Sequence, residues 1–423
     1  MKALLMSTSD ISGGAARAAY RLHQGLQRAS VDSKMLVQFK SSDDATVIAP
    51  RSSLSDAIAK LRVAVNALPP KLYSRQPETL FSTQWLPDTV LPAVKRLQPD
   101  VVNLHWIAAG FTRIETIAKF KQPVVWSLHD MWAFTGGCHY DDGCDRYRQS
   151  CGSCPQLNSQ TNWDLSRWTW QRKANAWRNT NLTIVGLSHW LAKCAHSSPL
   201  FHDQRIEVIP NGIDTDVYQP LDRQFARSVL KLPQDKRLVL FASMFATSDQ
   251  RKGFQFLQPA LQELSQSGWH DQLELVIMGA SRPQQPPDLG FKSHYLGTLS
   301  DDLLLALVYS AADVFVLPST QENLANTVME AIACGVPCVT FNIGGMPDMI
   351  EHQQNGYLAQ PYQVEDLARG IAWVLEDETR HQTLRYRARE KTEQEFTLDI
   401  QAQRYQSLFA ELIEEQRSPP SKI

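Results

Sequence analysis

Two glutamates, Glu322 and Glu330, lie eight positions apart in the segment of this sequence that best fits a binding or catalytic site. The segment follows the apolar run of residues 312–317, so it begins at the carboxyl end of an expected strand. Ligands of open α/β sheets bind at that edge. Carboxylates accept hydrogen bonds from sugar hydroxyls, and a loop that leads into a helix can present both groups to one ligand. Two solvated side chains are the alternative interpretation.

A second motif, Arg251-Lys252-Gly253, precedes an expected helix over residues 253–264. Lys252 can place an ammonium group against a diphosphate whose charge rises during bond cleavage. Gly253 and the start of the helix can add backbone N–H donors. For Arg251, contact with the same diphosphate and plain solvation both remain open.

Two features of the first half fit the same chemistry. Gly13 and Gly14 follow the first expected strand, and residues without a side chain let the backbone approach a phosphate or an acceptor closely. His129 ends the apolar run of residues 124–128 and can hydrogen-bond a sugar hydroxyl. A simple turn and a structural histidine are the alternatives.

In this order, the motifs resemble those of the retaining family 4 glycosyltransferases, which have the GT-B fold, and the resemblance covers nearly the whole chain. It includes residues 209–214, 251–253, 322–330 and 342–348. The resemblance implies that Glu322 lies by the transferred sugar and that Glu330 binds the nucleotide ribose. One departure is that Ser243-Met244-Phe245 stands where the family often has an arginine, which puts the affinity for phosphate in doubt.

The resemblance also defines two expected sets of residues. The catalytic set is Glu322, His129 and Lys252. The donor-binding set is Gly13, Gly14, Arg251, Lys252, Glu322, Asn323, Asn326 and Glu330.

The function that this implies is retaining transfer of a sugar from a UDP- or GDP-sugar to a saccharide or lipid-linked saccharide, in exopolysaccharide, capsule or lipopolysaccharide biosynthesis. No cofactor is expected to be required for catalysis. No general base is obvious for the acceptor hydroxyl, and in this family the departing phosphate is thought to take that role. Two alternatives are a sugar-nucleotide epimerase on the same fold and a non-catalytic sugar-binding subunit of an assembly.

Four cysteines, Cys138, Cys144, Cys151 and Cys154, fall within one polar loop with the spacing C-x5-C-x6-C-x2-C. A C-x2-C element is a good zinc ligand pair, and four thiolates complete a tetrahedral site. We therefore predict one structural, non-catalytic zinc ion. Free thiols and a disulfide pair are the alternatives.

Strand-like runs alternate with helical stretches in both halves of the chain. This order predicts an α/β protein of two Rossmann-like domains, each with a doubly wound parallel sheet, facing each other across a cleft. We expect an N-terminal acceptor-binding domain over residues 1–207 and a C-terminal nucleotide-sugar-binding domain over residues 208–395. A closing helix at 396–416 is expected to pack back on the first domain.

Composition limits the other possibilities. A formal net charge of −2 gives no support for nucleic-acid binding, which usually needs a basic excess. The amino terminus lacks the pattern of a secretory signal, and we expect a cytoplasmic protein, peripheral on the inner face of the membrane. Residues 53–75 have apolar positions at helical spacing together with lysine and arginine. They predict either a helix that packs on the core or a surface that meets lipid.

Overall fold

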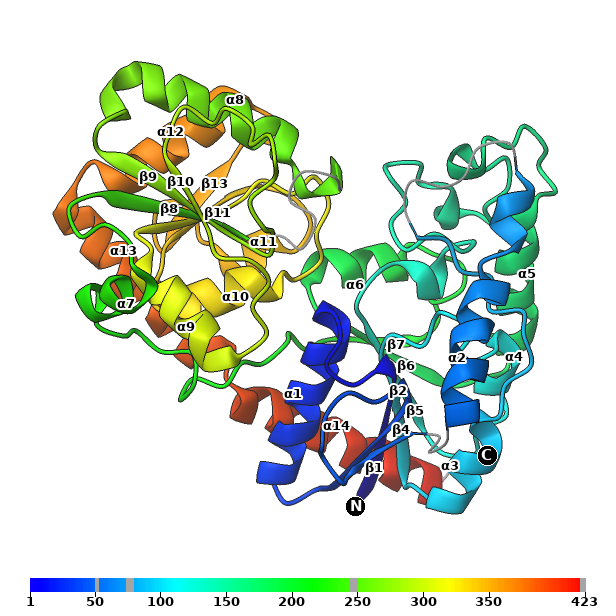
Figure 1. Cartoon of the computed structure of the whole chain (residues 1–423). Helices are drawn as coiled ribbons and strands as arrows, with labels where there is room; N and C mark the ends of the chain where they lie inside the picture. The colour runs from blue at the N-terminus through cyan, green and yellow to red at the C-terminus, as the bar shows by residue number, and fades with distance from the viewer. Residues whose placement is uncertain (50–52, 74–79, 243–249, 419–423) are drawn as a thin grey trace. The chain divides into compact units, whose positions relative to one another are not determined.

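A computed structural model describes residues 1–49, 53–73, 80–242 and 250–418 of the chain. The chain divides into two compact units, and each is described by itself (Figure 1). Unit 1 comprises Met1–Gly212 together with Asp399–Ile423, and unit 2 comprises Ile213–Leu398. The stretch Ser243-Met244-Phe245, where the family often has an arginine, lies outside the described part of the chain.

In its described residues, unit 1 has a seven-stranded parallel sheet with the order β3-β2-β1-β4-β5-β6-β7. The strands are β1 (Lys2–Ser9), β2 (Asp32–Phe39), β3 (Val47–Ile48), β4 (Val101–Leu104), β5 (Val124–Leu128), β6 (Leu182–Gly186) and β7 (Arg205–Val208). The central strands are almost continuously apolar because helices cover both faces of a parallel sheet. In β1, Ala3 and Leu5 enter one hydrophobic cluster while Leu4 and Met6 enter another.

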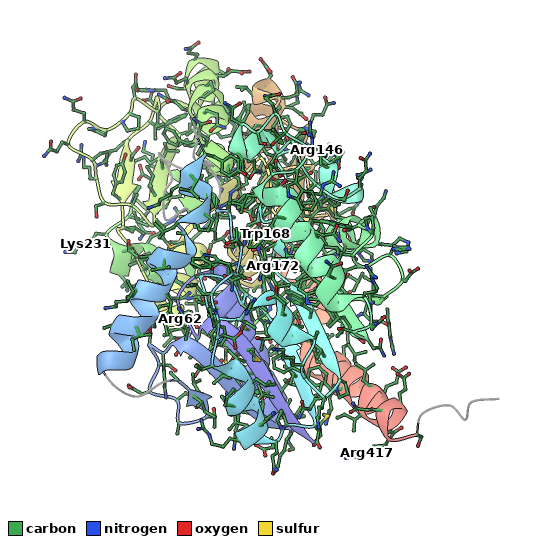
Figure 2. All side chains as sticks on the ribbon, turned by 90° about the vertical axis from the view of Figure 1, so that its right-hand side faces the viewer. Arg62, Arg146, Trp168, Arg172, Lys231 and Arg417 are labelled. Atoms are coloured by element: carbon green, nitrogen blue, oxygen red, sulfur yellow. The ribbon has the colours of Figure 1, made fainter. Side chains whose placement is uncertain are left out.

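Helices cover the two faces of this sheet. They are α1 (Gly14–Arg28), α2 (Ser53–Asn66), α3 (Val90–Leu97), α4 (Ile114–Ile117), α5 (Leu165–Trp177), α6 (His189–His196) and α14 (Leu398–Arg417). The final helix, α14, contributes Tyr405, Phe409 and Leu412 to the same buried cluster as Ala3 and Leu5 of β1. Figure 2 shows the side of unit 1 that carries α2 and the labelled Arg62.

In the described residues of unit 2, the sheet has six parallel strands with the order β10-β9-β8-β11-β12-β13. The strands are β8 (Arg237–Ala242), β9 (Leu273–Met278), β10 (Ser293–Tyr295), β11 (Val314–Leu317), β12 (Cys338–Phe341) and β13 (Gly356–Ala359). The helices are α7 (Arg223–Leu230), α8 (Phe254–Leu264), α9 (Asp302–Ala311), α10 (Asn326–Ala333), α11 (Met346–Met349), α12 (Val364–Leu375) and α13 (Glu378–Glu395).

Both sheets confirm the predicted architecture of two doubly wound, Rossmann-like units. In each sheet the chain builds outward from a central strand in one direction and then in the other. The order reverses between β1 and β4 in unit 1 and between β8 and β11 in unit 2. Loops that leave the carboxyl ends of strands at such a switch point are where this fold binds ligands. Among the described residues, no helix combines the length and apolar composition needed to span a bilayer.

The packing of α14 yields a stability prediction. Phe409 is fully buried against the sheet of unit 1, whereas Phe225 of unit 2 is 62% exposed. Phe409→Ala should lower the free energy of unfolding by about 3–5 kcal/mol, because it removes a buried ring and leaves a cavity. The matched change Phe225→Ala should stay within about 0.5 kcal/mol. Denaturant unfolding followed by hydrogen exchange on peptides of each unit would measure this. Equal losses for the two variants would contradict the assigned packing.

Candidate functional site

Glu322 is the centre of the charged site in unit 2. It lies in the loop between β11 and α10, at the carboxyl edge of the sheet. Its Oε1 accepts a hydrogen bond from the Nζ of Lys252 at 2.5 Å and another from the Oγ of Ser319 at 3.2 Å. The side chain of Glu322 is 10% exposed and that of Lys252 is 25% exposed. The pair therefore sits at the surface edge of the core, where a ligand can reach the ammonium group.

Close backbone packing at two glycines holds this loop. A Cβ at Gly253 would lie 1.7 Å from the carbonyl oxygen of Pro318, and one at Gly344 would lie 1.9 Å from that of Glu322. Both glycines also have positive φ angles, +74° for Gly253 and +51° for Gly344, which residues with a Cβ rarely adopt. The backbone N–H of Thr320 donates to the carbonyl of Arg251 at 2.9 Å. Three separate motifs of the sequence therefore meet at the backbone of one loop.

The surroundings keep Glu322 ionised. Burial alone would raise the pKa of its carboxyl, but the charges of Lys252 and Arg251 outweigh burial. Hydrogen bonds from Lys252 and Ser319 act in the same direction, so the pKa lies below its ordinary value. The site presents an ammonium and a carboxylate side by side, which suits a ligand with both anionic and hydroxyl groups.

Glu330 lies near the middle of α10, eight positions after Glu322. It is 4% exposed, and its Oε2 accepts a hydrogen bond from the Oη of Tyr309 at 3.0 Å. Asn323 is buried in the loop, while Asn326 is half-buried at the first position of the helix. The loop and helix thus carry all four of the predicted acidic and amide side chains on one continuous segment.

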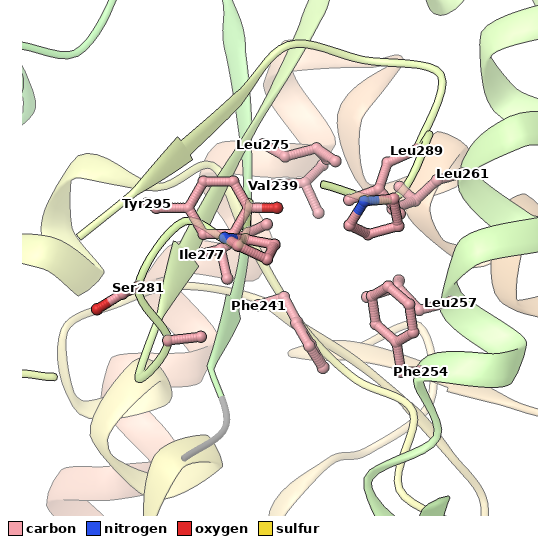
Figure 3. A pocket seen from close by; sticks show the side chains of 13 residues that line it. Val239, Phe241, Phe254, Leu257, Leu261, Leu275, Ile277, Ser281, Leu289 and Tyr295 are labelled. Carbon is pink, nitrogen blue, oxygen red and sulfur yellow. The ribbon is translucent and has the colours of Figure 1, made fainter. Parts of the chain in front are cut away.

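An apolar pocket lies between α8 and the strands of the same sheet (Figure 3). Its lining includes Phe241, Phe254 and Leu257, and apart from Ser281 and Tyr295 the lining side chains are apolar. No charged side chain lines this pocket, so it offers no ionic group like the Lys252–Glu322 pair.

In unit 1, the predicted glycine turn follows β1. Gly13 has φ +92° and precedes α1, and no heavy atom lies within 4 Å of the position that its Cβ would take. The buried carboxylate of Asp10 holds this turn, because it accepts hydrogen bonds from the backbone N–H groups of Ser41 and Ser42 at 2.8–3.0 Å. Gly13 and Gly14 therefore begin a helix at the switch point of the sheet.

His129 lies at the end of β5 and is half-buried. Its Nε2 is 2.9 Å from the Nδ1 of His105, which follows β4. The Nε2 of His105 is in turn 2.9 Å from the Oδ1 of Asn103, whose amide group donates to the carbonyl of Val125 and to Ser127. The orientation of the Asn103 amide is thus set by its two acceptors.

This series of hydrogen bonds determines which ring nitrogens of His105 and His129 carry protons. The Oδ1 of Asn103 can only accept, so the Nε2 of His105 carries hydrogen. Burial lowers the pKa of both histidines, that of His129 to about 4, so both rings are neutral near pH 7. The Nδ1 of His105 must then accept, and the Nε2 of His129 must donate. We assign His129 as the tautomer whose Nδ1 bears the lone pair.

Asp130, the neighbour of His129, has a structural role. Its Oδ2 lies 2.6 Å from the Nδ1 of His139 and accepts from the indole N–H of Trp106 at 2.8 Å. The Nε2 of His139 is 2.9 Å from the Oγ of Ser82. Burial would raise the pKa of Asp130, but these partners lower it. Asp130 therefore clamps the loop beyond β5, and His139 is occupied in this clamp.

The zinc ion predicted at the four cysteines stays a prediction. All four cysteines of the loop are free thiols, and across the described residues no group of three or more His, Cys, Asp or Glu side chains is arranged to hold a metal ion. Cys138 and Cys154 pack with Phe81 and Leu157, while Cys151 packs against the main core of the unit. Burial raises the pKa of all four thiols.

Sequence reasoning missed several residues of these sites. His105 follows a buried strand exactly as His129 does, so the same criterion could have identified it. Asp10 and Asn103 gave no comparable indication, because their roles depend on partners far away in the sequence. Lys173 is fully buried, donates to the carbonyl of Thr135 at 3.0 Å and lies 3.9 Å above the ring of Trp132. These contacts make Lys173 an internal brace of this loop.

Comparisons with known proteins agree with this fold. Residues 12–217 match the profile of Glycosyltransferase Family 4, and residues 222–391 match that of Glycosyl transferases group 1. The N-acetyl-alpha-D-glucosaminyl L-malate synthase of Bacillus anthracis is 22% identical over 240 residues, 56% of this chain. The chain spans only 61% of the length of that relative.

Two solved structures are similar over nearly the full length. Sucrose-phosphate synthase from Thermosynechococcus elongatus has a TM-score of 0.68 and 19% identity, covering 98% of this chain and 100% of that one. Anabaena HepE in complex with UDP-glucose has a TM-score of 0.61 and 17% identity, covering 97% and 100%. At these identities the likeness establishes the fold.

The ion pair of unit 2 predicts a pH-dependent loss of stability. The folded pKa of Glu322 lies below its unfolded value, so the stability it contributes is present above the unfolded pKa and is lost as pH falls. Lys252→Met should destabilise the protein by about 1–3 kcal/mol at neutral pH, less than a fully buried pair would, because Lys252 is partly exposed. The loss should shrink toward pH 4.

Denaturant unfolding between pH 4 and pH 8 would measure this effect. Lys231→Met, at an exposed lysine of the same unit, is the control and should change little. The double variant Lys252→Met/Glu322→Gln should recover part of the stability, because no uncompensated charge remains. A loss that does not depend on pH would contradict the role of the pair.

The hydrogen-bond chain of unit 1 predicts the tautomer of His129. Nitrogen NMR of labelled protein should show a protonated Nε2 and an unprotonated Nδ1. Asn103→Leu should mix the tautomers, because His105 loses the acceptor that fixes its proton, whereas Asn103→Asp retains an acceptor and should preserve the order. Observation of a protonated Nδ1 in the unaltered protein would show that the assigned direction is wrong.

Proposed function

The chain belongs to the family 4 glycosyltransferases of the GT-B fold, and we propose that it transfers a sugar from a nucleotide-sugar donor to a saccharide or lipid-linked saccharide acceptor with retention of anomeric configuration. The observation that carries this proposal is the Lys252–Glu322 pair, 2.5 Å apart, at the carboxyl edge of the sheet in unit 2. We assign the donor to this edge.

Lys252 serves the leaving group. When the bond between the anomeric carbon and the phosphate oxygen breaks, the electron pair stays on the oxygen, and the diphosphate gains negative charge. The ammonium group of Lys252 and the amino-terminal end of α8 stabilise that charge. The acceptor hydroxyl forms the new bond to the anomeric carbon, and its proton passes to the departing phosphate. This path needs no carboxylate or imidazole base from the protein.

Glu322 orients the transferred sugar. The low pKa of its carboxyl keeps it a hydrogen-bond acceptor for sugar hydroxyls. In the structure Lys252 satisfies this carboxylate, and a bound diphosphate attracts the ammonium group away, which leaves the carboxylate oxygens to the sugar. The buried carboxylate of Glu330 then accepts from the hydroxyls of the ribose. Asn323, Asn326 and Arg251 contact the remaining polar groups of the donor.

In unit 1, we assign further substrate contacts to His129 and to the glycine turn. His129, whose Nε2 hydrogen is directed at His105, is assigned to hydrogen-bond a sugar hydroxyl. Gly13 and Gly14 let the backbone approach a phosphate or an acceptor. We place the reaction in exopolysaccharide, capsule or lipopolysaccharide biosynthesis, in the cytoplasm. UDP-glucose in the similar fold of Anabaena HepE supports a uridine nucleotide, with a guanosine nucleotide as the alternative.

Donor turnover tests the proposal and separates it from the two alternatives. The full chain is incubated with a panel of UDP- and GDP-sugars, with and without lipid-linked saccharides, and products are analysed by mass spectrometry and NMR. A transferase releases nucleoside diphosphate and forms a glycoside with the anomeric configuration of the donor. An isomerised sugar without acceptor would identify an epimerase. Binding without turnover of any donor would favour a non-catalytic subunit.

The assigned role of Glu330 predicts a change in nucleotide affinity. Glu330→Ala should weaken binding of UDP or GDP by about tenfold to a hundredfold, since a hydrogen bond to a charged group contributes about 1.5–3 kcal/mol. Tyr309→Phe removes the protein partner of this carboxylate and is the control, because it leaves the acceptor in place. Calorimetry measures both affinities. Unchanged binding by the Glu330 variant would remove this residue from the site.

A further inference from the structure

An exposed aliphatic face runs along α2 and the short helix η1 (Pro69–Leu72) of unit 1. Ile58, Leu61, Leu68 and Leu72 are 49%, 62%, 49% and 87% exposed. The sequence left open whether residues 53–75 pack on the core or meet lipid, and these side chains do not pack on the core. Leu54 and Arg75, which belong to the same pattern, lie outside the side chains that the structure describes. We call the four exposed residues the α2 face.

The opposite side of the helix anchors it to the unit. Ala59 and Asn66 are buried, and the guanidinium of Arg62 donates to the carbonyl of Gly110 at 2.8 and 3.2 Å. The helix is thus fixed by one side while large aliphatic side chains of the other side meet solvent. Monomeric soluble proteins rarely expose contiguous apolar surface without a binding role.

Exposed tryptophans lie close to one end of the α2 face. The Oη of Tyr73, next to Leu72, accepts a hydrogen bond from the backbone N–H of Leu165 at 2.8 Å, which brings η1 to the start of α5. Trp163 is 70% exposed and Trp168 is 38% exposed. Figure 2 looks onto the side of unit 1 that carries α2 and the labelled Trp168. Tryptophan is enriched at the headgroup level of bilayers, where its ring meets lipid and its N–H meets water.

Apart from Asp56 near the start of α2, the charged residues of α2 and η1 are basic. Between residues 57 and 73 the sequence contains Lys60, Arg62 and Lys71 and no acidic residue. Lys60 and Lys71 are exposed beside the leucines. Aliphatic side chains flanked by lysines complement a surface of acyl chains and anionic headgroups, whereas a protein partner of this chemistry would need a matching acidic rim.

We propose that the α2 face is a membrane-docking surface that binds anionic phospholipid bilayers. The helix lies in the interfacial plane with its leucines among the upper acyl chains, the tryptophans at the headgroups and the two lysines on the lipid phosphates. Because the anchoring side of α2 is already satisfied by unit 1, docking requires no refolding. The proposal does not depend on the transferase activity. A lipid-linked acceptor would be held in the same bilayer.

Vesicle co-sedimentation of the full chain tests this proposal. The vesicles are phosphatidylcholine alone or an equimolar mixture of phosphatidylcholine and phosphatidylglycerol. We expect binding to the anionic vesicles that weakens with salt. The triple variant Leu61→Ser/Leu68→Ser/Leu72→Ser should lower the partition coefficient by about tenfold or more, since three aliphatic side chains no longer enter the bilayer. Lys60→Glu/Lys71→Glu should abolish the preference for phosphatidylglycerol.

The chain offers a matched control in unit 2. Phe225, Val229 and Leu303 are 62%, 51% and 67% exposed, so Phe225→Ser/Val229→Ser/Leu303→Ser makes the same chemical change elsewhere and should leave vesicle binding unaltered. Thermal unfolding of each variant verifies folding. Absence of binding by the unaltered protein to either vesicle would overturn the proposal, as would equal losses for the two triple variants. Sedimentation velocity that shows a dimer dissociated by the Leu variants, with vesicle binding unchanged, would instead assign the α2 face to a second copy.

Discussion

A carboxylate that is almost removed from water needs a cation beside it, and this requirement organises the polar edge of unit 2. Glu322 is nearly buried because Gly253 and Gly344 allow two other backbone segments to press against its loop. Burial alone would raise the pKa of its carboxyl, and the charges of Lys252 and Arg251 outweigh burial. The glycines, the lysine and the glutamate are therefore one physical unit. Any substituent on either glycine would push the loop away and separate the charges.

Unit 1 also buries polar side chains, but those of its hydrogen-bond chain are neutral. His129, His105, Asn103 and Ser127 form a continuous hydrogen-bond chain, and the Oγ of Ser127 lies 2.7 Å from the Oη of Tyr405 on α14. Each group is satisfied without a net charge, so burial carries little penalty as long as every proton has a fixed place. The charged edge of unit 2 suits anionic ligands. The hydrogen-bond chain of unit 1 instead fixes which ring nitrogen of His129 donates.

Much of this architecture follows from local sequence, and the limits have physical causes. The largely apolar runs Arg237–Ala242 and Leu273–Met278 form β8 and β9, as expected of buried parallel strands. The strand expected at 312–317 begins only at Val314, since Ala312 caps α9. Glu322 and Lys252 were identified by their motifs. The cysteine spacing predicts a zinc site, but spacing alone cannot show that Cys138 and Cys154 pack in an apolar cluster with Phe81. The exposure of Leu61 and Leu72 likewise depends on which side of α2 the rest of the unit covers.

The return of α14 to unit 1 has a consequence for biosynthesis. Unit 2 is one continuous stretch, whereas unit 1 is assembled from the first and the last parts of the chain. During translation, unit 2 can finish folding while one face of the β1 sheet still lacks Tyr405, Phe409 and Leu412. Until those residues leave the ribosome, the nascent chain carries an uncovered apolar surface. Folding of unit 1 is therefore incomplete until α14, which follows unit 2 in the chain, can pack against the sheet.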